Sequence, residues 1–206
     1  MKLHHVSGSR SLRVRWLLEE LSLPYELERH ALGGASLRSP EYRALNPQGR
    51  VPTLEDEGTV LFESGAIMQY LLERYGEGRL EPAPGDPMRA AYLQWFHWGE
   101  AALMPALHVI MGNRFVLKEE DRSEKALGVA RKQFAQSLRV LGDALGKADY
   151  LVGDAFSAAD IMVVYGITLV KQVGEMPEEP LVVHRWQDRL VARPAFQAAF
   201  EGGVAG

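Results

Sequence analysis

The chain has 206 residues, of which 47% are hydrophobic, and a formal net charge of -4 at pH 7. This length suits one large domain or two small ones, each with its own core. The acidic balance excludes a general basic surface for nucleic acid, and the absence of cysteine excludes a thiolate nucleophile, a thioredoxin-type redox pair and a thiolate metal site.

Neither a membrane span nor a secretory leader is predicted. The longest apolar stretch, residues 161–170, has ten residues, about half of the length needed to cross a bilayer. The first residues, MKLHHVSGSR, lack the apolar core of a signal peptide, and we therefore expect a cytoplasmic protein. The six histidines lack the short helical spacings that bring two imidazoles onto one metal, so no metal site is expected.

The first part of the chain alternates between strand and helix patterns. Residues 2–6 resemble a short strand, and residues 24–30 alternate in the manner of a second strand. Between them, four apolar residues have the spacing of one helical face: Val14, Leu17, Leu18 and Leu21. Ser39 is expected to cap a short helix whose first residue is Pro40. Because a helix joins the first two strands, they are predicted to be parallel.

A hairpin and a third helix complete this α/β segment. The β-prone runs Val51–Leu54 and Val60–Phe62 flank the turn residues DEG. The following helix is expected to end at Gly76 and to present one apolar face, formed by Ile67, Tyr70, Leu71 and Tyr75. We predict a first domain over residues 1–78, followed by a glycine- and proline-rich linker.

Only helical patterns follow the linker. A long helix after Pro87 is expected to bend near Pro105, which lacks an amide donor. A second helix, over 122–145, spaces four residues to face a core: Phe134, Leu138, Leu141 and Leu145. Ser157 and Asp160 form a capping-box pattern before a buried helix, and further helices are predicted over 181–191 and 195–200. The second predicted domain, residues 88–206, is all-helical.

Four stretches in this order carry a family resemblance: SRSLRVRWLLEELSLPYEL, NPQGRVPTLED, ESGAIMQYL and YLVGDAFSAADI. Together they resemble the cytosolic glutathione transferase family, in particular its serine-type, theta- or delta-like bacterial members. The resemblance spans nearly the whole chain. It implies a thioredoxin-like α/β N-terminal domain and an all-α C-terminal domain, the glutathione transferase fold.

The resemblance also implies a set of glutathione-binding residues. Val51-Pro52 stands where such folds place a cis proline, so that the Val51 backbone can pair with the extended tripeptide. By resemblance, Ser64 and its amide hold the γ-glutamyl carboxylate at a helix N-terminus, and Glu63 takes the ammonium group. The glycine carboxylate is expected to pair with Arg50, assisted by Gln48.

The thiol is expected at the loop before the first helix. Family members activate it with a tyrosine, serine or cysteine, and the positions for tyrosine and cysteine are not so occupied here. Ser9 is therefore the first candidate, with Arg10 and Ser11 next. A serine hydroxyl is too weak an acid to be a resting base, so we expect it to donate a hydrogen bond to a thiolate that the helix N-terminus already favours.

The implied activity is addition of the glutathione thiolate to a hydrophobic electrophile by a homodimer, with glutathione as co-substrate and no cofactor or metal. Residues chosen as walls of the electrophile pocket are Trp98, Met111, Arg114, Phe115 and Tyr165. A second hypothesis is a maleylacetoacetate isomerase-like enzyme, whose motif SSCSWRVR is approached by GSRSLRVR with Arg10 for cysteine and Leu12 for tryptophan. The sequence is also compatible with glutathione peroxidase activity and with a non-catalytic binding module of the same fold.

Overall fold

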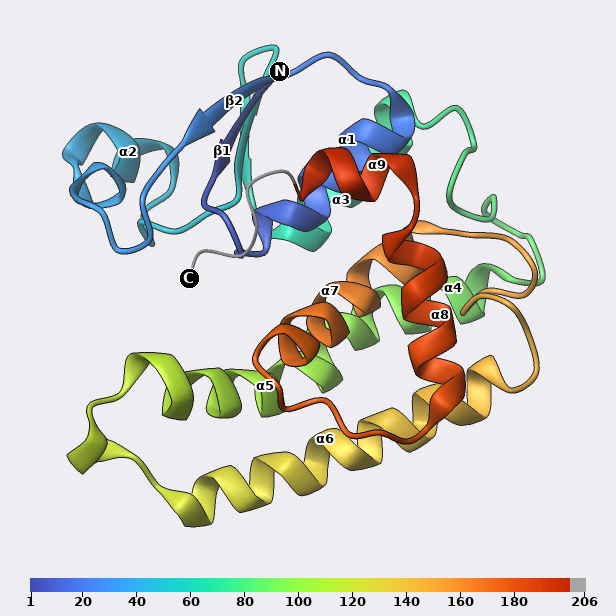
Figure 1. The fold of residues 1–206 in the computed structure, drawn as a ribbon. Coiled ribbons are helices and arrows are strands. Elements are labelled where there is room, and N and C mark those ends of the chain that lie inside the picture. The colour runs from blue at the N-terminus through green and yellow to red at the C-terminus, as the bar shows by residue number, and fades with distance from the viewer. Residues whose placement is uncertain (201–206) are drawn as a thin grey trace. The chain divides into compact units, whose positions relative to one another are not determined.

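The computed structural model describes residues 1–200, which form two compact units (Figure 1). The first unit contains residues 1–81 and 191–200, and the second contains residues 82–190. The division predicted from the sequence, 1–78 and 88–206, assigns the end of the chain to the second domain. In the structure, helix α9 (Pro194–Ala199) packs within the first unit.

A mixed four-stranded sheet organises the first unit, with the order β2-β1-β3-β4. The strands are β1 (Lys2–His5), β2 (Glu26–Arg29), β3 (Thr53–Asp56) and β4 (Thr59–Phe62). β1 and β2 are parallel, with Leu3 opposite Leu27, and β3 is antiparallel to both β1 and β4. The predicted parallel pair and the predicted hairpin are both confirmed.

Four helical segments accompany this sheet. They are α1 (Ser11–Leu21), the short 3-10 helix η1 (Ala35–Arg38), α2 (Pro40–Leu45) and α3 (Ser64–Tyr75). Helix α1 begins at Ser11, three residues before the apolar pattern that starts at Val14, and the 3-10 helix was not predicted. The Ser39 hydroxyl accepts a hydrogen bond from the Tyr42 amide, 3.2 Å away, which confirms the predicted cap of α2.

The predicted apolar face of α3 is partly wrong. Ile67 and Leu71 are buried as expected, but they are joined by Met68 and Leu72. The remaining expected members, Tyr70 and Tyr75, are only half-buried because both hydroxyls donate hydrogen bonds to Asp56 at the end of β3. Their rings therefore lie at the border of the core, with the polar end directed to a carboxylate.

Helix α9 lies along α1, as Figure 1 shows. The ring of Phe196 meets the edge of Trp16, with centroids 4.9 Å apart. Arg193 donates two hydrogen bonds, of 2.6 and 2.8 Å, to the Glu20 carboxylate. Arg15 donates to the Ala199 carbonyl at 2.7 Å. The end of the described chain thus covers a face of α1 that the first 81 residues leave open.

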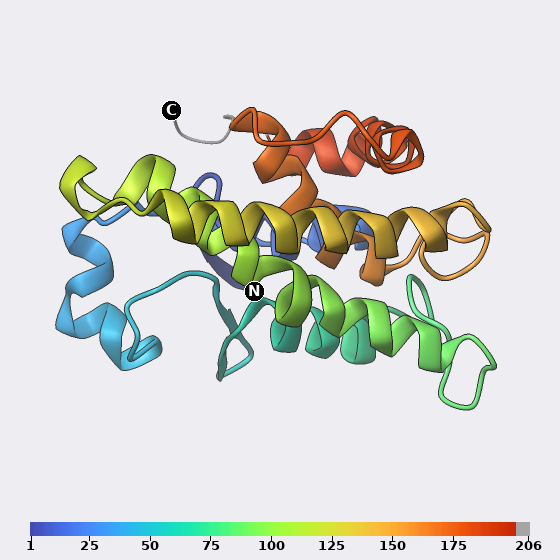
Figure 2. The same cartoon turned by 90° about the horizontal axis from the view of Figure 1, so that it is seen from below.

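The second unit is helical. Its α-helices are α4 (Arg89–Trp98), α5 (Met104–Met111), α6 (Glu124–Leu145), α7 (Ala158–Gln172) and α8 (Leu181–Val191). Figure 2 shows α6 as one long helix running alongside α5. Two π-helical segments, η2 (Gly99–Leu103) and η3 (Gly112–Val116), precede and follow α5. The first of them ends at Leu103, two residues before Pro105, near which the sequence predicts a bend. A single 3-10 turn, η4 (Glu119–Asp121), leads into α6.

Helix α7 forms the centre of this unit, since every residue from 161 to 170 is buried. Its predicted capping box is confirmed, because Ser157 and Asp160 bond reciprocally at the helix start. The same Asp160 carboxylate also accepts hydrogen bonds from the Leu151 amide and the Trp186 indole, each at 3.1 Å. Across residues 1–200, no helix has the length and apolar character needed to span a membrane.

Candidate active site

The loop between β1 and α1 places Ser9 at the start of the first helix. The Ser9 amide donates to the Val6 carbonyl at 3.1 Å, and the Ser9 carbonyl accepts from the Leu12 amide at 3.0 Å. Ser9 is half-exposed, and Arg10 holds the N-cap position of α1. These hydrogen bonds fix the backbone of Ser9, while its side chain remains accessible.

Three side chains, from the end of β1, the loop and the first residue of α1, form a continuous chain of polar contacts. The Ser9 and Ser11 hydroxyl oxygens are 2.7 Å apart, and the Ser11 oxygen is 2.8 Å from Nδ1 of His5. The Ser9 hydroxyl also donates to the Val6 carbonyl at 2.8 Å. Ser11 is 0% exposed, so of the two predicted serines only Ser9 can contact a ligand directly.

His5 is the buried end of this contact. Desolvation by burial, together with the positive charges of Arg15 and Arg29, lowers its pKa from 6.5 to about 4. The imidazole is therefore neutral at neutral pH, with one nitrogen protonated.

A cavity of about 350 Å³ opens beside Ser9 in the first unit. Four of the predicted site residues line it: Ser9, Gln48, Arg50 and Val51. The rest of its wall comes from seven residues that the sequence does not mark as site residues: Val6, Leu32, Gly33, Gly34, Leu37, Arg38 and Gly49. The adjacent glycines are a visible signal of a close turn, but nothing in the sequence pattern places Arg38 beside Arg50.

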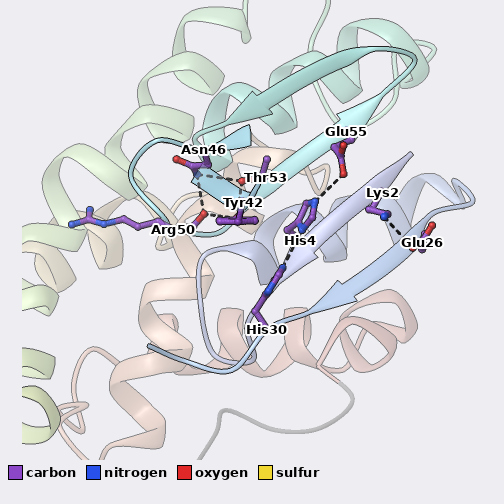
Figure 3. A network of polar contacts seen from close by, with 9 residues as sticks. All are labelled: Lys2, His4, Glu26, His30, Tyr42, Asn46, Arg50, Thr53 and Glu55. Carbon is purple, nitrogen blue, oxygen red and sulfur yellow. Dashed lines mark hydrogen bonds and ion pairs between the residues drawn. The ribbon is translucent and has the colours of Figure 1, made fainter. Parts of the chain in front are cut away.

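Hydrogen bonds to one carbonyl hold the far wall of the cavity (Figure 3). The Arg50 carbonyl accepts from the Tyr42 hydroxyl at 2.6 Å and from the Asn46 amide group at 2.8 Å. The next peptide, Val51-Pro52, is cis, as the resemblance implies, and Pro52 is buried at the entry to β3. Residues 46–52 are thus fixed from the core side while the Arg50 side chain remains exposed.

Gly49 allows this loop to pack closely against η1. Its backbone has φ +62°, and a Cβ atom at this position would lie 2.6 Å from the Leu37 carbonyl oxygen. Both the left-handed backbone and the close contact exclude a side chain here. The width of the cavity between residues 37 and 50 therefore depends on a glycine at position 49.

Glu63 and Ser64 stand between β4 and α3, as predicted. Ser64 is 4% exposed, and its hydroxyl accepts a hydrogen bond from Arg13 on α1 at 3.3 Å. Glu63 is exposed and has φ +75°, a conformation that costs a residue with a side chain on the order of 1–3 kcal/mol. Neither residue, nor Pro52, lines the cavity beside Ser9.

The starts of α1 and α3 lack the caps that several other helices have. Neither has a capping side-chain hydrogen bond or an acidic residue in its first turn. In contrast, α2, α6 and α7 each begin with a serine cap and an acidic first turn. A helix N-terminus carries partial positive charge and can bind an anion. The helices α4, α5 and α9 also lack a cap and an acidic first turn, but α1 and α3 are the two that begin beside predicted site residues, Ser9 and Ser64.

The residues predicted to contact an electrophile all lie in the second unit, on different segments. Trp98 and Met111 are half-buried at the ends of α4 and α5. Arg114 and Phe115 are exposed on η3, and Arg114 forms an ion pair with Glu175 at 2.5 Å. Tyr165 is 4% exposed in the middle of α7, so its side chain belongs to the core of this unit.

His4, next to the loop that carries Ser9, belongs to a different polar chain (Figure 3). Its Nδ1 is 3.0 Å from Nε2 of His30, and its Nε2 is 2.9 Å from a Glu55 oxygen. These side chains extend across the sheet rather than towards Ser9. In the part of the chain that the structure describes, no cluster of histidine and acidic residues could hold a metal ion.

The sheet order β2-β1-β3-β4 with its flanking helices, followed by a helical unit, defines the glutathione transferase class of folds. Residues 3–81 match the protein family described as glutathione S-transferase, N-terminal domain, and residues 100–194 match its C-terminal domain. The chain is 30% identical to glutathione S-transferase 3 of Schizosaccharomyces pombe over 97% of this chain and 86% of that protein. It therefore belongs to the glutathione S-transferase family.

Further relatives agree with this assignment. Glutathione S-transferase GstB of Escherichia coli is 31% identical over 89% of this chain and 88% of its own length. A theta class glutathione S-transferase from Xanthomonas axonopodis pv. citri, solved with glutathione bound, superposes with a TM-score of 0.84. It is 28% identical, over 99% of this chain and 98% of that one. A glutathione transferase of Phanerochaete chrysosporium with oxidized glutathione gives a TM-score of 0.86 at 25% identity, over 97% and 94% of the two chains.

Proposed function

We propose that this protein binds glutathione beside Ser9 and transfers its thiolate to a hydrophobic electrophile. The observation that carries the proposal is the cavity of the first unit, which unites an accessible serine at a helix start with two arginine side chains. Structural neighbours solved with glutathione or its oxidised form support the choice of ligand. No cofactor beyond this co-substrate is required.

The glycine end of glutathione lies between Arg38 and Arg50 in this proposal. Both arginines line the same cavity, and a carboxylate placed between two arginines gains charge-assisted hydrogen bonds. Gln48 adds an amide donor, and the backbone of Val51 pairs with the extended tripeptide. Arg38 extends the predicted binding set, which for this carboxylate contains Arg50 and Gln48.

The γ-glutamyl end lies at the start of α3. An uncapped helix start without an acidic first turn favours a carboxylate, and the Ser64 hydroxyl and amide are there to receive it. The strained backbone of Glu63 supports a functional role, because such conformations persist where they position a group for binding. The Glu63 carboxylate pairs with the ammonium group of the γ-glutamyl residue of glutathione.

The sulfur lies next to Ser9 at the start of α1. The Ser9 hydroxyl donates a hydrogen bond to the thiolate, and the helix N-terminus and Arg10 add favourable electrostatic interactions. The thiol proton leaves to solvent. The sulfur then forms a bond with the electrophilic carbon, and in a chloronitrobenzene the carbon–chlorine bond breaks and chloride leaves with its electron pair.

The electrophile pocket, with Trp98, Met111, Arg114, Phe115 and Tyr165 as its walls, stays part of the proposal, as do the homodimer and a cytoplasmic location. The ion pair of Arg114 and the burial of Tyr165 make these two the weakest members of the set. Trp98, Met111 and Phe115 have exposed surface that a ligand can reach.

Ser9→Ala tests the catalytic role, with Ser7→Ala from the same loop as its matched control. Loss of one hydrogen bond to a charged sulfur costs about 1.5–3 kcal/mol, so turnover of a chloronitrobenzene should fall roughly 10- to 100-fold in Ser9→Ala. Ser7→Ala should keep the parent rate, and both variants should bind glutathione in calorimetry. An unchanged rate in Ser9→Ala would reassign the catalytic residue, and absence of binding in the parent protein would favour a scaffold role.

A further inference from the structure

The donor directions within the contact from Ser9 to His5 can be worked out from its distances. The Ser9 oxygen is 2.8 Å from the Val6 carbonyl oxygen, and a carbonyl oxygen can only accept. Two acceptors at this distance without a hydrogen between them would repel, so the Ser9 hydroxyl hydrogen points to Val6 in the free protein.

The remaining hydrogens follow from this first one. Because Ser9 has one hydroxyl hydrogen, the 2.7 Å contact with Ser11 must use the hydrogen of Ser11. A weaker acceptor for Ser11, the Val6 carbonyl, is 3.3 Å away. Ser11 then has no hydrogen left for His5, and the 2.8 Å contact between them requires a hydrogen on Nδ1 of His5. Neutral His5 is therefore the Nδ1–H tautomer.

With this order of hydrogens, the Ser9 hydroxyl can act towards a ligand only as a hydrogen-bond donor. Its oxygen accepts from the Ser11 hydroxyl and, at 3.3 Å, from the Ser11 amide, which occupies both lone pairs. A thiol needs an acceptor for its S–H hydrogen, whereas a thiolate needs a donor. When the Ser9 hydroxyl turns from Val6 to a ligand, it stabilises the ionised sulfur and not the protonated one.

We propose that His5 and Ser11 are positioning residues that hold Ser9 as an obligate donor to the sulfur of the co-substrate. The inference rests on the proposed function for its ligand, but the hydrogen order itself belongs to the free protein. Two charged groups face His5 from neighbouring elements, Arg15 on α1 and Arg29 on β2. Burial and these two charges disfavour a positive imidazole, so His5 stays neutral throughout the neutral pH range and protonation does not disturb the order of donors.

The first test is nitrogen NMR of His5 in the free full-length protein at neutral pH. The two neutral tautomers of histidine give opposite patterns of chemical shift at Nδ1 and Nε2. We expect the Nδ1–H pattern for His5. An Nε2–H pattern would overturn the inference, because His5 would then accept from Ser11 and Ser9 would regain a free lone pair. This measurement needs no glutathione and is independent of the proposed function.

The second test compares His5→Asn with His5→Leu. An asparagine amide can supply a donor near the position of Nδ1, whereas leucine fills similar volume without one. Ultraviolet absorbance of the bound thiolate, followed against pH, gives the pKa of glutathione in the complex. We expect this pKa to rise by about one unit in His5→Leu, a roughly tenfold smaller thiolate fraction near neutral pH, and to return towards the parent value in His5→Asn.

Ser11→Ala interrupts the same series of hydrogen bonds at the residue next to Ser9. It should also raise the pKa of the bound thiol. Glutathione affinity, measured by calorimetry at a pH below the thiol pKa, should change little in these variants because the carboxylate contacts remain. Equal thiol pKa values in the parent, His5→Leu and Ser11→Ala proteins would overturn the inference. If the parent protein binds no glutathione, the proposed function fails, and the tautomer measurement still supports or overturns the hydrogen order.

Discussion

Glu175 is a single residue held by two arginines from separate helical segments. Its carboxylate accepts two hydrogen bonds from Arg131 on α6, at 2.7 and 2.8 Å, and one from Arg114 on η3 at 2.7 Å. Hydrogen bonding by Arg131 is the main cause that lowers the pKa of Glu175 from 4.5 to about 2, although burial opposes it. This carboxylate ties the segment after α7 to the rest of the second unit.

The lowered pKa makes this contact dependent on pH. Because the folded-state pKa lies below the ordinary value, the stabilisation is present above about pH 4.5 and is lost as the pH falls towards 2. Since both arginines are about half-exposed, screening limits the effect to about 1–2 kcal/mol. The difference in unfolding free energy between the parent and Glu175→Gln, measured with urea, should shrink between pH 7 and pH 3. A constant difference would contradict this account.

Residue-scale contacts of this kind are the part of the site that sequence reasoning predicted least. Arg114 was expected to contact a ligand, yet its partner Glu175 is 61 residues away in sequence and no periodic pattern connects them. Ser11 and Ser9 look alike in the sequence, and only the fold shows that one is buried. Ser9, Arg50 and Ser64 are predicted from the family resemblance together with their places at helix starts and in a loop, and the structure brings Ser9 and Arg50 to one cavity.

At the scale of elements, the loop from Asn46 to Pro52 is the connection that shapes the cavity. Gly49→Ala should reduce glutathione affinity at least tenfold, because the new Cβ would lie 2.6 Å from the Leu37 carbonyl and push the loop away from η1. Gly58→Ala is the matched control, since Gly58 also has positive φ but nothing within 4 Å of an added Cβ.

Both glycine variants should lose about 1–2 kcal/mol of unfolding free energy from the left-handed backbone alone, and Gly49→Ala should lose more. Urea unfolding and calorimetry with glutathione measure the two effects separately. Equal affinity in the two variants would show that the close contact at Gly49 does not set the cavity width.

Element boundaries were largely predictable, for identifiable local reasons. The β3–β4 turn contains Glu57 and Gly58, both with positive φ, which suits the two-residue hairpin that DEG predicted. The caps of α2 and α7 followed from serine placement. The face of α3 was less predictable, because tyrosine counts as apolar in a periodic pattern until a carboxylate such as Asp56 is found beside its hydroxyl.

At the scale of the whole molecule, the first unit is discontinuous in sequence. Phe196 is buried against Trp16 and stacks on Phe200, with ring centroids 3.9 Å apart in the second contact. Phe196→Ala should therefore lower the unfolding free energy by about 3–5 kcal/mol. Phe115→Ala, a control at a site with 63% exposure, should change it by less than about 0.5 kcal/mol.

Tryptophan fluorescence during urea unfolding measures both variants, and Trp16 should become more exposed to water in Phe196→Ala. A loss below about 1 kcal/mol would mean that α9 adds little to the first unit. The sequence reasoning found this helix but assigned it to the second domain, because order along the chain was the available guide and the contacts of Arg15 and Glu20 with α9 are not encoded in any local pattern.

The late position of α9 has a consequence for synthesis on the ribosome. The sheet and α1 emerge first, yet the helix that covers α1 is translated only after the entire second unit. Nascent chains of this protein must therefore keep an apolar patch around Trp16 uncovered for most of translation, and a chaperone that binds such patches would find its target there until α9 has been synthesised.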